Sequence, residues 1–97
     1  MRVIVKIGTS SLTSDSGEVN MSALSKLVSE VVAARRQEHE IVVVTSGAIT
    51  AGVQKLGIPR PDEPEILQAL SAVGQIDLMR AYGEEFGSHG VATGQVL

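Results

Sequence analysis

The chain has 97 residues, a formal net charge of −3, and a composition of 43% hydrophobic and 20% charged residues. This length corresponds to one domain or part of one, and the composition is ordinary for a globular chain. Cysteine is absent, which excludes a disulfide framework and any thiolate metal site. The basic residues form no cluster beyond Arg35 and Arg36, and aromatic residues are scarce, so we expect no nucleic-acid partner for this segment.

We expect neither a secretory signal nor a membrane segment at the N-terminus. Arg2 leads into a short apolar-rich stretch at residues 3–7, which gives way to glycine, serine and threonine. A secretory apolar region takes about 7–15 residues and a membrane span about 20. The sequence therefore predicts a cytoplasmic protein with no membrane partner.

The first half of the chain predicts a strand, a loop, a helix and a second strand. Residues 3–7 are rich in β-branched side chains and read as a buried strand, and the Gly/Ser/Thr-rich residues 8–20 read as a loop. Asn20 is a suitable N-cap for a helix that begins at Met21 and ends in the polar residues 35–40. Residues 41–44 are apolar without alternation, which predicts a strand covered on both faces.

The second half predicts mainly helices. Residues 49–56 form a short helix that Gly57 ends, and an exposed, proline-rich connection leads to a helix with Pro64 in its first turn. Gly74 and the following glutamine are expected to interrupt that helix before a fourth helical segment. Residues 91–97 are expected to begin a third strand.

This order of elements is typical of an α/β fold with a mainly parallel sheet and right-handed crossovers. Sheets buried on both faces usually contain about 5–6 strands, and a strand at the end of the chain leaves an open edge. We therefore expect the 97 residues to be incomplete as a fold, either a piece of a longer protein or a degraded fragment.

Two Gly/Ser/Thr-rich loops follow the predicted strands, at the carboxyl edge where open parallel sheets bind ligands. In the first loop, Gly8, Thr9 and Ser10 allow close backbone approach and offer N–H donors to an anion, and Lys6 can add a positive charge beside phosphate. The alternative is that Lys6 extends from a strand end into solvent and Gly8 only turns the chain.

The second loop contains Ser46, Gly47 and Ala48 at the start of a predicted helix. A helix N-terminus favours a carboxylate or a phosphate. The alternative is that Ser46 is an N-cap and Gly47 a turn residue, with no ligand. Two such loops at one sheet edge favour binding.

Other site patterns are missing or weak. No P-loop, dinucleotide-binding or nucleophile-elbow motif occurs. His39 and His89 lie in polar connections and are expected to be solvated. The acidic residues at 62–65 suit a helix start better than a metal site, so no metal ligands are predicted.

Four segments share one family pattern: VKIGTSSLT at positions 5–13, VVTSGAI at 43–49, AVGQ at 72–75 and GQVL at 94–97. In sequence and order they resemble the glutamate 5-kinases, a branch of the amino acid kinase family. The Lys-x-Gly strand end is shared by the wider family, whereas the GTS, SGAI and AVGQ segments are more particular to glutamate 5-kinases. The resemblance extends over nearly the whole chain.

The resemblance implies a three-layer αβα sandwich and ATP-dependent phosphorylation of the side-chain carboxylate of L-glutamate, which yields glutamyl 5-phosphate for proline biosynthesis. It implies Mg²⁺ held mainly by the nucleotide phosphates. It also assigns roles by position, with Lys6 as the catalytic cation, Gly8, Thr9 and Ser10 as the ATP-phosphate cradle, and Ser46, Gly47 and Ala48 as the glutamate-binding residues.

By the same resemblance, residues 1–97 form the N-terminal, glutamate-binding part of the kinase domain, without the nucleotide-binding half. The chain alone is then expected to be inactive, and the full-length protein to be a homo-oligomer. Three alternatives stay open: another amino acid kinase, a non-catalytic amino-acid sensor, and an interaction fragment that associates through residues 91–97.

Overall fold

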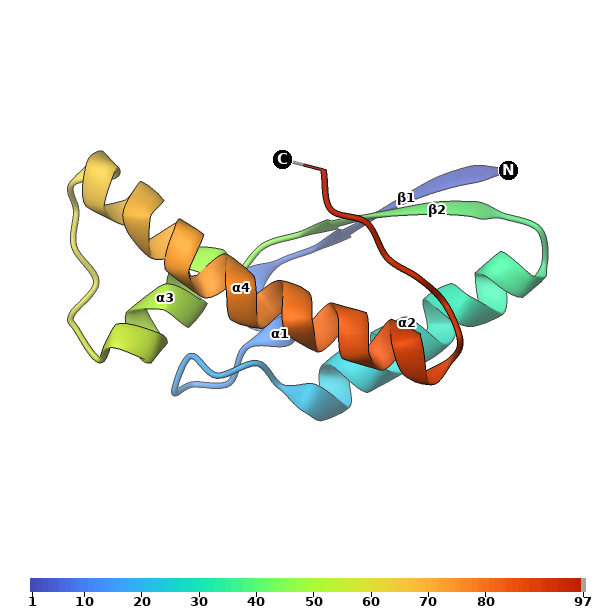
Figure 1. The fold of residues 1–97 in the computed structure, drawn as a ribbon, viewed down its shortest axis with the longest axis horizontal. Coiled ribbons are helices and arrows are strands. Elements are labelled where there is room, and N and C mark those ends of the chain that lie inside the picture. Colours follow the sequence, from blue (N-terminus) through green and yellow to red (C-terminus); the bar gives the residue numbers. More distant parts are fainter. Residues whose placement is uncertain (97) are drawn as a thin grey trace.

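The computed structural model of the protein describes residues 1–96. In chain order the elements are β1 (Arg2–Ile7), α1 (Thr9–Leu12), α2 (Met21–Arg36), β2 (Glu40–Thr45), α3 (Ala48–Leu56) and α4 (Pro64–Ser88). The two strands pair in parallel, with Lys6 opposite Val44 and Ile7 opposite Thr45 (Figure 1). The predicted α/β class with a parallel sheet is thus confirmed.

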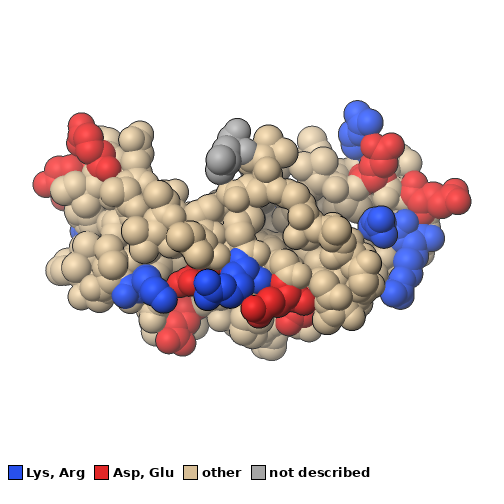
Figure 2. Space-filling model, in the orientation of Figure 1, with Lys and Arg blue, Asp and Glu red and all other residues tan. Residues whose placement is uncertain are grey.

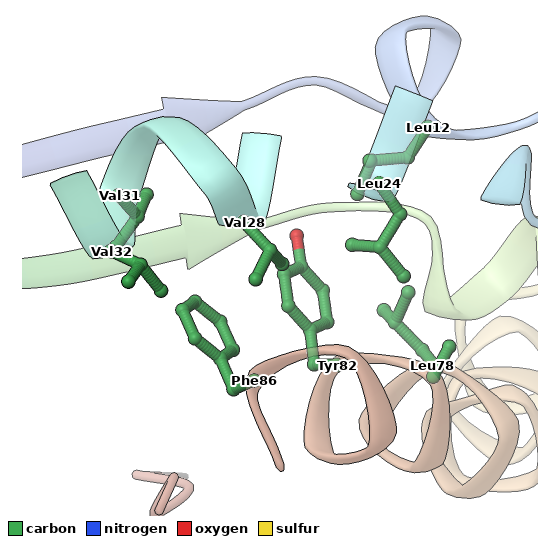
Figure 3. Close-up of a cluster of buried hydrophobic side chains, with 9 residues drawn as sticks. Leu12, Leu24, Val28, Val31, Val32, Leu78, Tyr82 and Phe86 are labelled. Atoms are coloured by element: carbon green, nitrogen blue, oxygen red, sulfur yellow. The ribbon is translucent and has the colours of Figure 1, made fainter. Parts of the chain in front are cut away.

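The core lies between one face of the sheet and the helices α2 and α4 (Figure 1). Ile7, Ile41 and Val43 pack against it from the sheet. Figure 3 shows side chains of α2 and α4 pointing toward one another in this core. Its buried members are Leu12, Leu24, Val28, Val31, Val32, Leu78, Ala81, Tyr82 and Phe86. The repeat of three and four residues in α2 accounts for its four buried positions.

The opposite face of the sheet is uncovered among the described residues. Ile4, Val42 and Val44 point to this side and are 66%, 50% and 46% exposed. The prediction that residues 41–44 are covered on both faces is therefore wrong for the described part of the chain. Successive side chains of a strand point to opposite faces, and an apolar run does not say whether a second layer is present. Residues 1–96 accordingly form two layers of the expected three-layer sandwich.

The segment after β1 contains more regular structure than the predicted loop. Residues 9–12 form the single-turn helix α1, and Thr13 pairs with Val19 in an antiparallel bridge. Asn20 caps α2 as predicted, because its Oδ1 accepts the N–H of Ala23 at 3.1 Å.

Helix α4 runs without interruption through Gly74, so the predicted break at this glycine is wrong. Gly74 is present for packing: a Cβ here would overlap the carbonyl oxygen of Ala48 and the backbone nitrogen of Gly52. Gly52 is the counterpart in α3, since its Cβ would overlap the carbonyl of Leu70. The two glycines allow α3 and α4 to pack backbone against backbone.

The predicted strand at residues 91–97 is also wrong for the described part. Residues 91–96 form no regular structure, and Leu97 lies outside the described residues. The N–H of Val91 bonds to the carbonyl of Phe86 at 3.0 Å, and only the side chain of Val91 packs on the core. A strand needs a neighbouring edge to pair with, which these residues do not meet within 1–96. None of the helices described over residues 1–96 has the length and apolar content of a membrane span.

Candidate substrate-binding site

The two predicted loops lie side by side at the carboxyl edge of the sheet. Lys6 and Val44 are register partners, and the N–H of Ser46 donates to the carbonyl of Ile7 at 3.0 Å. In Figure 1, α1 and α3 begin at this same end of β1 and β2. The structure therefore brings together the strand end of Lys6, the first loop and the second loop.

Gly8 is not required for turning the chain. Its φ of −79° and ψ of 159° are open to any residue, and nothing lies within 4 Å of where its Cβ would be. Gly8 precedes α1, so the N–H groups of Thr9 and Ser10 begin a helix and have no acceptor within it. The first loop thus offers amide donors beside open space, as an anion would require.

Lys6 lies on the uncovered face of the sheet, together with Arg2 and Ile4. Its side chain is exposed and is absent from the lining of the cavity described below, which Thr9 reaches from the same loop. The structure therefore places Lys6 at the predicted edge, but outside the cavity that Ser46 and Ala48 line.

The second loop leaves the N-terminus of α3 without a side-chain cap. Gly47 is the N-cap residue, in a left-handed conformation (φ 113°, ψ −4°) that favours glycine. No side chain caps the helix, so the alternative role of Ser46 as an N-cap is not observed. Ser46 is exposed, and the first N–H groups of α3 lack intrahelical acceptors.

A cavity of about 390 Å³ opens between these loops and α4. Its lining residues are Thr9, Thr45, Ser46, Gly47, Ala48, Ile49, Thr50, Arg60, Ser71 and Gln75. Among them Arg60 is the only charged residue, so the cation and the positive end of α3 act together on whatever enters. The cavity is suited to a small anion such as a carboxylate.

Sequence reasoning missed six of the lining residues: Thr45, Ile49, Thr50, Arg60, Ser71 and Gln75. Arg60 lies in the proline-rich connection, which was assigned only as exposed, and Ser71 and Gln75 lie one turn apart on α4. Gln75 could have been found from its place in the AVGQ segment. Arg60 had no such signal, because its approach to Ser46 depends on how the connection folds back.

Tyr82 is connected to the second loop by hydrogen bonds through Thr45. Its hydroxyl donates to Oγ1 of Thr45 at 2.8 Å, and Thr45 Oγ1 donates to the carbonyl of Ser46 at 3.2 Å. Burial raises the pKa of the Tyr82 hydroxyl, and the hydrogen bond with Thr45 acts in the opposite direction. The tyrosine is therefore neutral at physiological pH and able to donate.

A second cavity, of about 290 Å³, lies between residues 17–21, α3 and α4, and none of the predicted site residues lines it. Its lining includes Glu18, Asp77, Arg80 and Glu84. Arg80 lies 3.8 Å from Asp77, which is also 3.7 Å from Lys55. Figure 2 shows charges of both signs interleaved along the lower edge of the face in view, while the middle of that face is uncharged. Because three carboxylates and one cation line this cavity, it is less suited to an anion than the first.

The histidines lie away from the candidate site. His39 precedes β2, at the amino end of the strands, and His89 follows α4. Each is partly buried rather than fully solvated as predicted, and Nδ1 of His39 is buried without a hydrogen-bond partner. Within residues 1–96, no three His, Asp or Glu side chains are placed to hold a metal ion.

Comparison with known proteins identifies one family. The model of the amino acid kinase family matches residues 1–97. A Bacillus licheniformis protein named glutamate 5-kinase 2 is 47% identical over 99% of this chain, and a Hydrogenovibrio crunogenus glutamate 5-kinase is 44% identical over the same share. The matched part is 26% of the length of each of these relatives. For an Oenococcus oeni glutamate 5-kinase, 39% identical, it is 36%.

Proposed function

We propose, from the premise that this chain belongs to the amino acid kinase family, that it is the N-terminal, glutamate-binding part of a glutamate 5-kinase. The chain spans about a quarter of the length of most relatives named above, so the proposed activity is that of a longer protein. The observation that carries the proposal is the hydrogen bond from the Ser46 N–H to the Ile7 carbonyl. It holds the two amide-rich loops together at the carboxyl edge of the sheet.

The proposed reaction transfers the γ-phosphoryl group of ATP to the side-chain carboxylate of L-glutamate. A carboxylate oxygen attacks the γ-phosphorus, the bond from that phosphorus to the β,γ-bridging oxygen breaks, and ADP leaves. Glutamate has an ordinary pKa near 4.3 and is ionised at neutral pH, so no base has to remove a proton. The obstacle is the repulsion between two anions, which cations and amide donors reduce.

The cavity would hold glutamate. Ser46, Gly47 and Ala48 would bind it at the N-terminus of α3, and Arg60 is the cation that would attract one of its carboxylates. Seating glutamate here leaves its reacting carboxylate close to the first loop, since Thr9 lines the same cavity.

The first loop would hold the phosphates. Gly8, Thr9 and Ser10 would supply amide and hydroxyl donors, and Lys6 would supply positive charge from the uncovered side of the edge. A magnesium ion would be held mainly through the phosphate oxygens of ATP. The ion would neutralise charge on the nucleotide.

A cytoplasmic location and a role in proline biosynthesis belong to this proposal.

The test is ATP-dependent formation of glutamyl hydroxamate by the protein expressed over its full reading frame, with a panel of other amino acids and acids as acceptors. Lys6→Met should lower kcat by about 10²-fold or more, the usual loss for one transition-state contact. Arg2→Met removes a charge from the same strand and face at its other end, and should leave kcat unchanged. Ser46→Ala should raise KM for glutamate.

Two results would contradict the proposal. The first is that the full-length protein consumes ATP only with an acceptor other than glutamate, or binds glutamate without consuming ATP. The other is a Lys6→Met variant as active as the Arg2→Met control. Residues 1–97 alone should show no turnover.

A further inference from the structure

A hydrogen-bond relay connects the C-terminal half of α4 to the loop at the candidate site. The Tyr82 hydroxyl donates to Thr45 Oγ1 at 2.8 Å, and Thr45 Oγ1 donates to the Ser46 carbonyl at 3.2 Å. The ring of Tyr82 is buried in the core, with the residue 6% exposed, and Figure 3 shows its oxygen pointing out of that core toward the end of β2. The relay therefore spans 37 residues of sequence to reach one peptide group.

That peptide group is the one between Ser46 and Gly47. Because a peptide unit is planar and trans, the direction of its C=O fixes the direction of its N–H. Holding the Ser46 carbonyl on the Thr45 hydroxyl thus sets where the Gly47 N–H points, and both residues line the cavity.

The same peptide group precedes the α-carbon of Gly47, the residue of the loop with the greatest conformational freedom. Gly47 has φ 113°, and glycine populates both signs of φ about equally. A rotation of the Ser46–Gly47 peptide would therefore cost little by itself, and it would exchange the places of the N–H and the C=O. A carbonyl oxygen would then replace a donor at a site proposed to bind a carboxylate.

Packing alone does not require the Tyr82 hydroxyl. The ring stacks on Phe86 with centroids 6.4 Å apart and planes at 14°, a contact that a phenylalanine at position 82 would keep. The hydroxyl accounts only for the bond to Thr45. It is the part of this core residue that acts on the loop.

We propose that Tyr82 is a positioning residue, whose hydroxyl acts through Thr45 to hold the Ser46–Gly47 peptide with its N–H available to the substrate carboxylate. This rests on the proposed function in one respect, that the loop binds the acceptor substrate. The proposal predicts a defect in glutamate binding that is separate from any loss of folded protein.

The experiment compares Tyr82→Phe, Thr45→Val, Thr45→Ser and the Tyr82→Phe/Thr45→Val double variant in the full-length protein, with steady-state kinetics in glutamate and in ATP. Tyr82→Phe should raise KM for glutamate by about 2- to 12-fold, the factor expected for one net hydrogen bond, and leave KM for ATP unchanged. Thr45→Val should raise KM for glutamate by at least this factor. Thr45→Ser keeps the hydroxyl and should have a KM for glutamate close to that of the wild type. The double variant should be no worse than Thr45→Val, because both changes break one relay.

Phe86→Leu is the control for a purely structural effect. It disturbs the same ring stack without touching the relay, so it should lower the melting temperature and leave KM for glutamate unchanged. A Tyr82→Phe variant with an unchanged KM for glutamate, or with equal increases for glutamate and ATP, overturns the positioning role alone. A wild-type protein without glutamate-dependent turnover overturns the proposed function and the positioning role together.

Discussion

Replacing Gly74 with alanine should destabilise this protein, although the same change in most helices is stabilising. Gly74 lies inside α4, where alanine is favoured over glycine by about 0.8–1.0 kcal/mol on intrinsic helix propensity. Here a methyl group would overlap the Ala48 carbonyl oxygen and the Gly52 nitrogen, and would lie 3.0 Å from the carbonyl carbon of Ala48. The sign of the effect therefore distinguishes close helix packing from helix propensity.

The magnitude follows from which atoms are in the way. Non-bonded heavy atoms pack at roughly 3.5–4.0 Å, so α3 would have to move from α4 by on the order of 1 Å. The obstructing atoms are backbone, which cannot rotate aside as the end of a side chain could. Overpacking typically costs about 1–3 kcal/mol. Because backbone atoms obstruct the methyl group, we take the upper end of about 3 kcal/mol, which leaves a net loss of about 2 kcal/mol after the gain in propensity.

Thermal and urea unfolding followed by far-ultraviolet circular dichroism measures this loss. For a domain of this size, 2 kcal/mol corresponds to a decrease in Tm of roughly 8–16 °C. Gly87→Ala is the matched control: Gly87 lies on the same helix and nothing is within 4 Å of where its Cβ would be. This control should be as stable as the wild type or more so. Since Ala48 begins α3, Gly74→Ala should also disturb the cavity.

A Gly74→Ala protein as stable as the Gly87→Ala control would refute the reasoning. It would mean that the two helices do not approach each other through Gly74. Gly52→Ala offers an independent check from the other helix, because its methyl group would overlap the Leu70 carbonyl.

Two further predictions concern the core. Leu24→Ala should cost about 2–5 kcal/mol, because Leu24 is completely buried and the surrounding helices can close the resulting cavity only in part; urea unfolding measures this, and a loss below 1 kcal/mol would contradict the packing. The second prediction concerns alkaline pH. Burial raises the pKa of Tyr82, so above its ordinary value of about 10 the native state keeps a proton that the unfolded state loses. The free energy of unfolding should fall as pH rises above about 10 toward the raised pKa, and this part of the decrease should vanish in Tyr82→Phe; an unchanged pH dependence in that variant would count against it.

Local signals in the sequence determined most of the element order. The β-branched runs predict both strands because such side chains suit a pleated surface. Asn20 and Gly57 were correctly assigned to helix ends, since capping depends on a residue and its immediate neighbours. The loops around Gly8 and Gly47 were placed at one sheet edge for the same kind of reason, because parallel strands put their carboxyl ends together.

The tertiary structure decided what depends on partners distant in sequence. Gly74 reads as a helix break on propensity, yet it is the contact point of a second helix that only the fold brings there. Residues 91–97 resemble a strand in sequence, but residues 91–96 pair with neither open edge of the two-stranded sheet. Arg60 at the cavity and the bond from Tyr82 to Thr45 likewise depend on how α3 and α4 fold over the sheet. The local structure that a residue favours depends on its neighbours along the chain, whereas its tertiary contacts are fixed only when the whole chain packs.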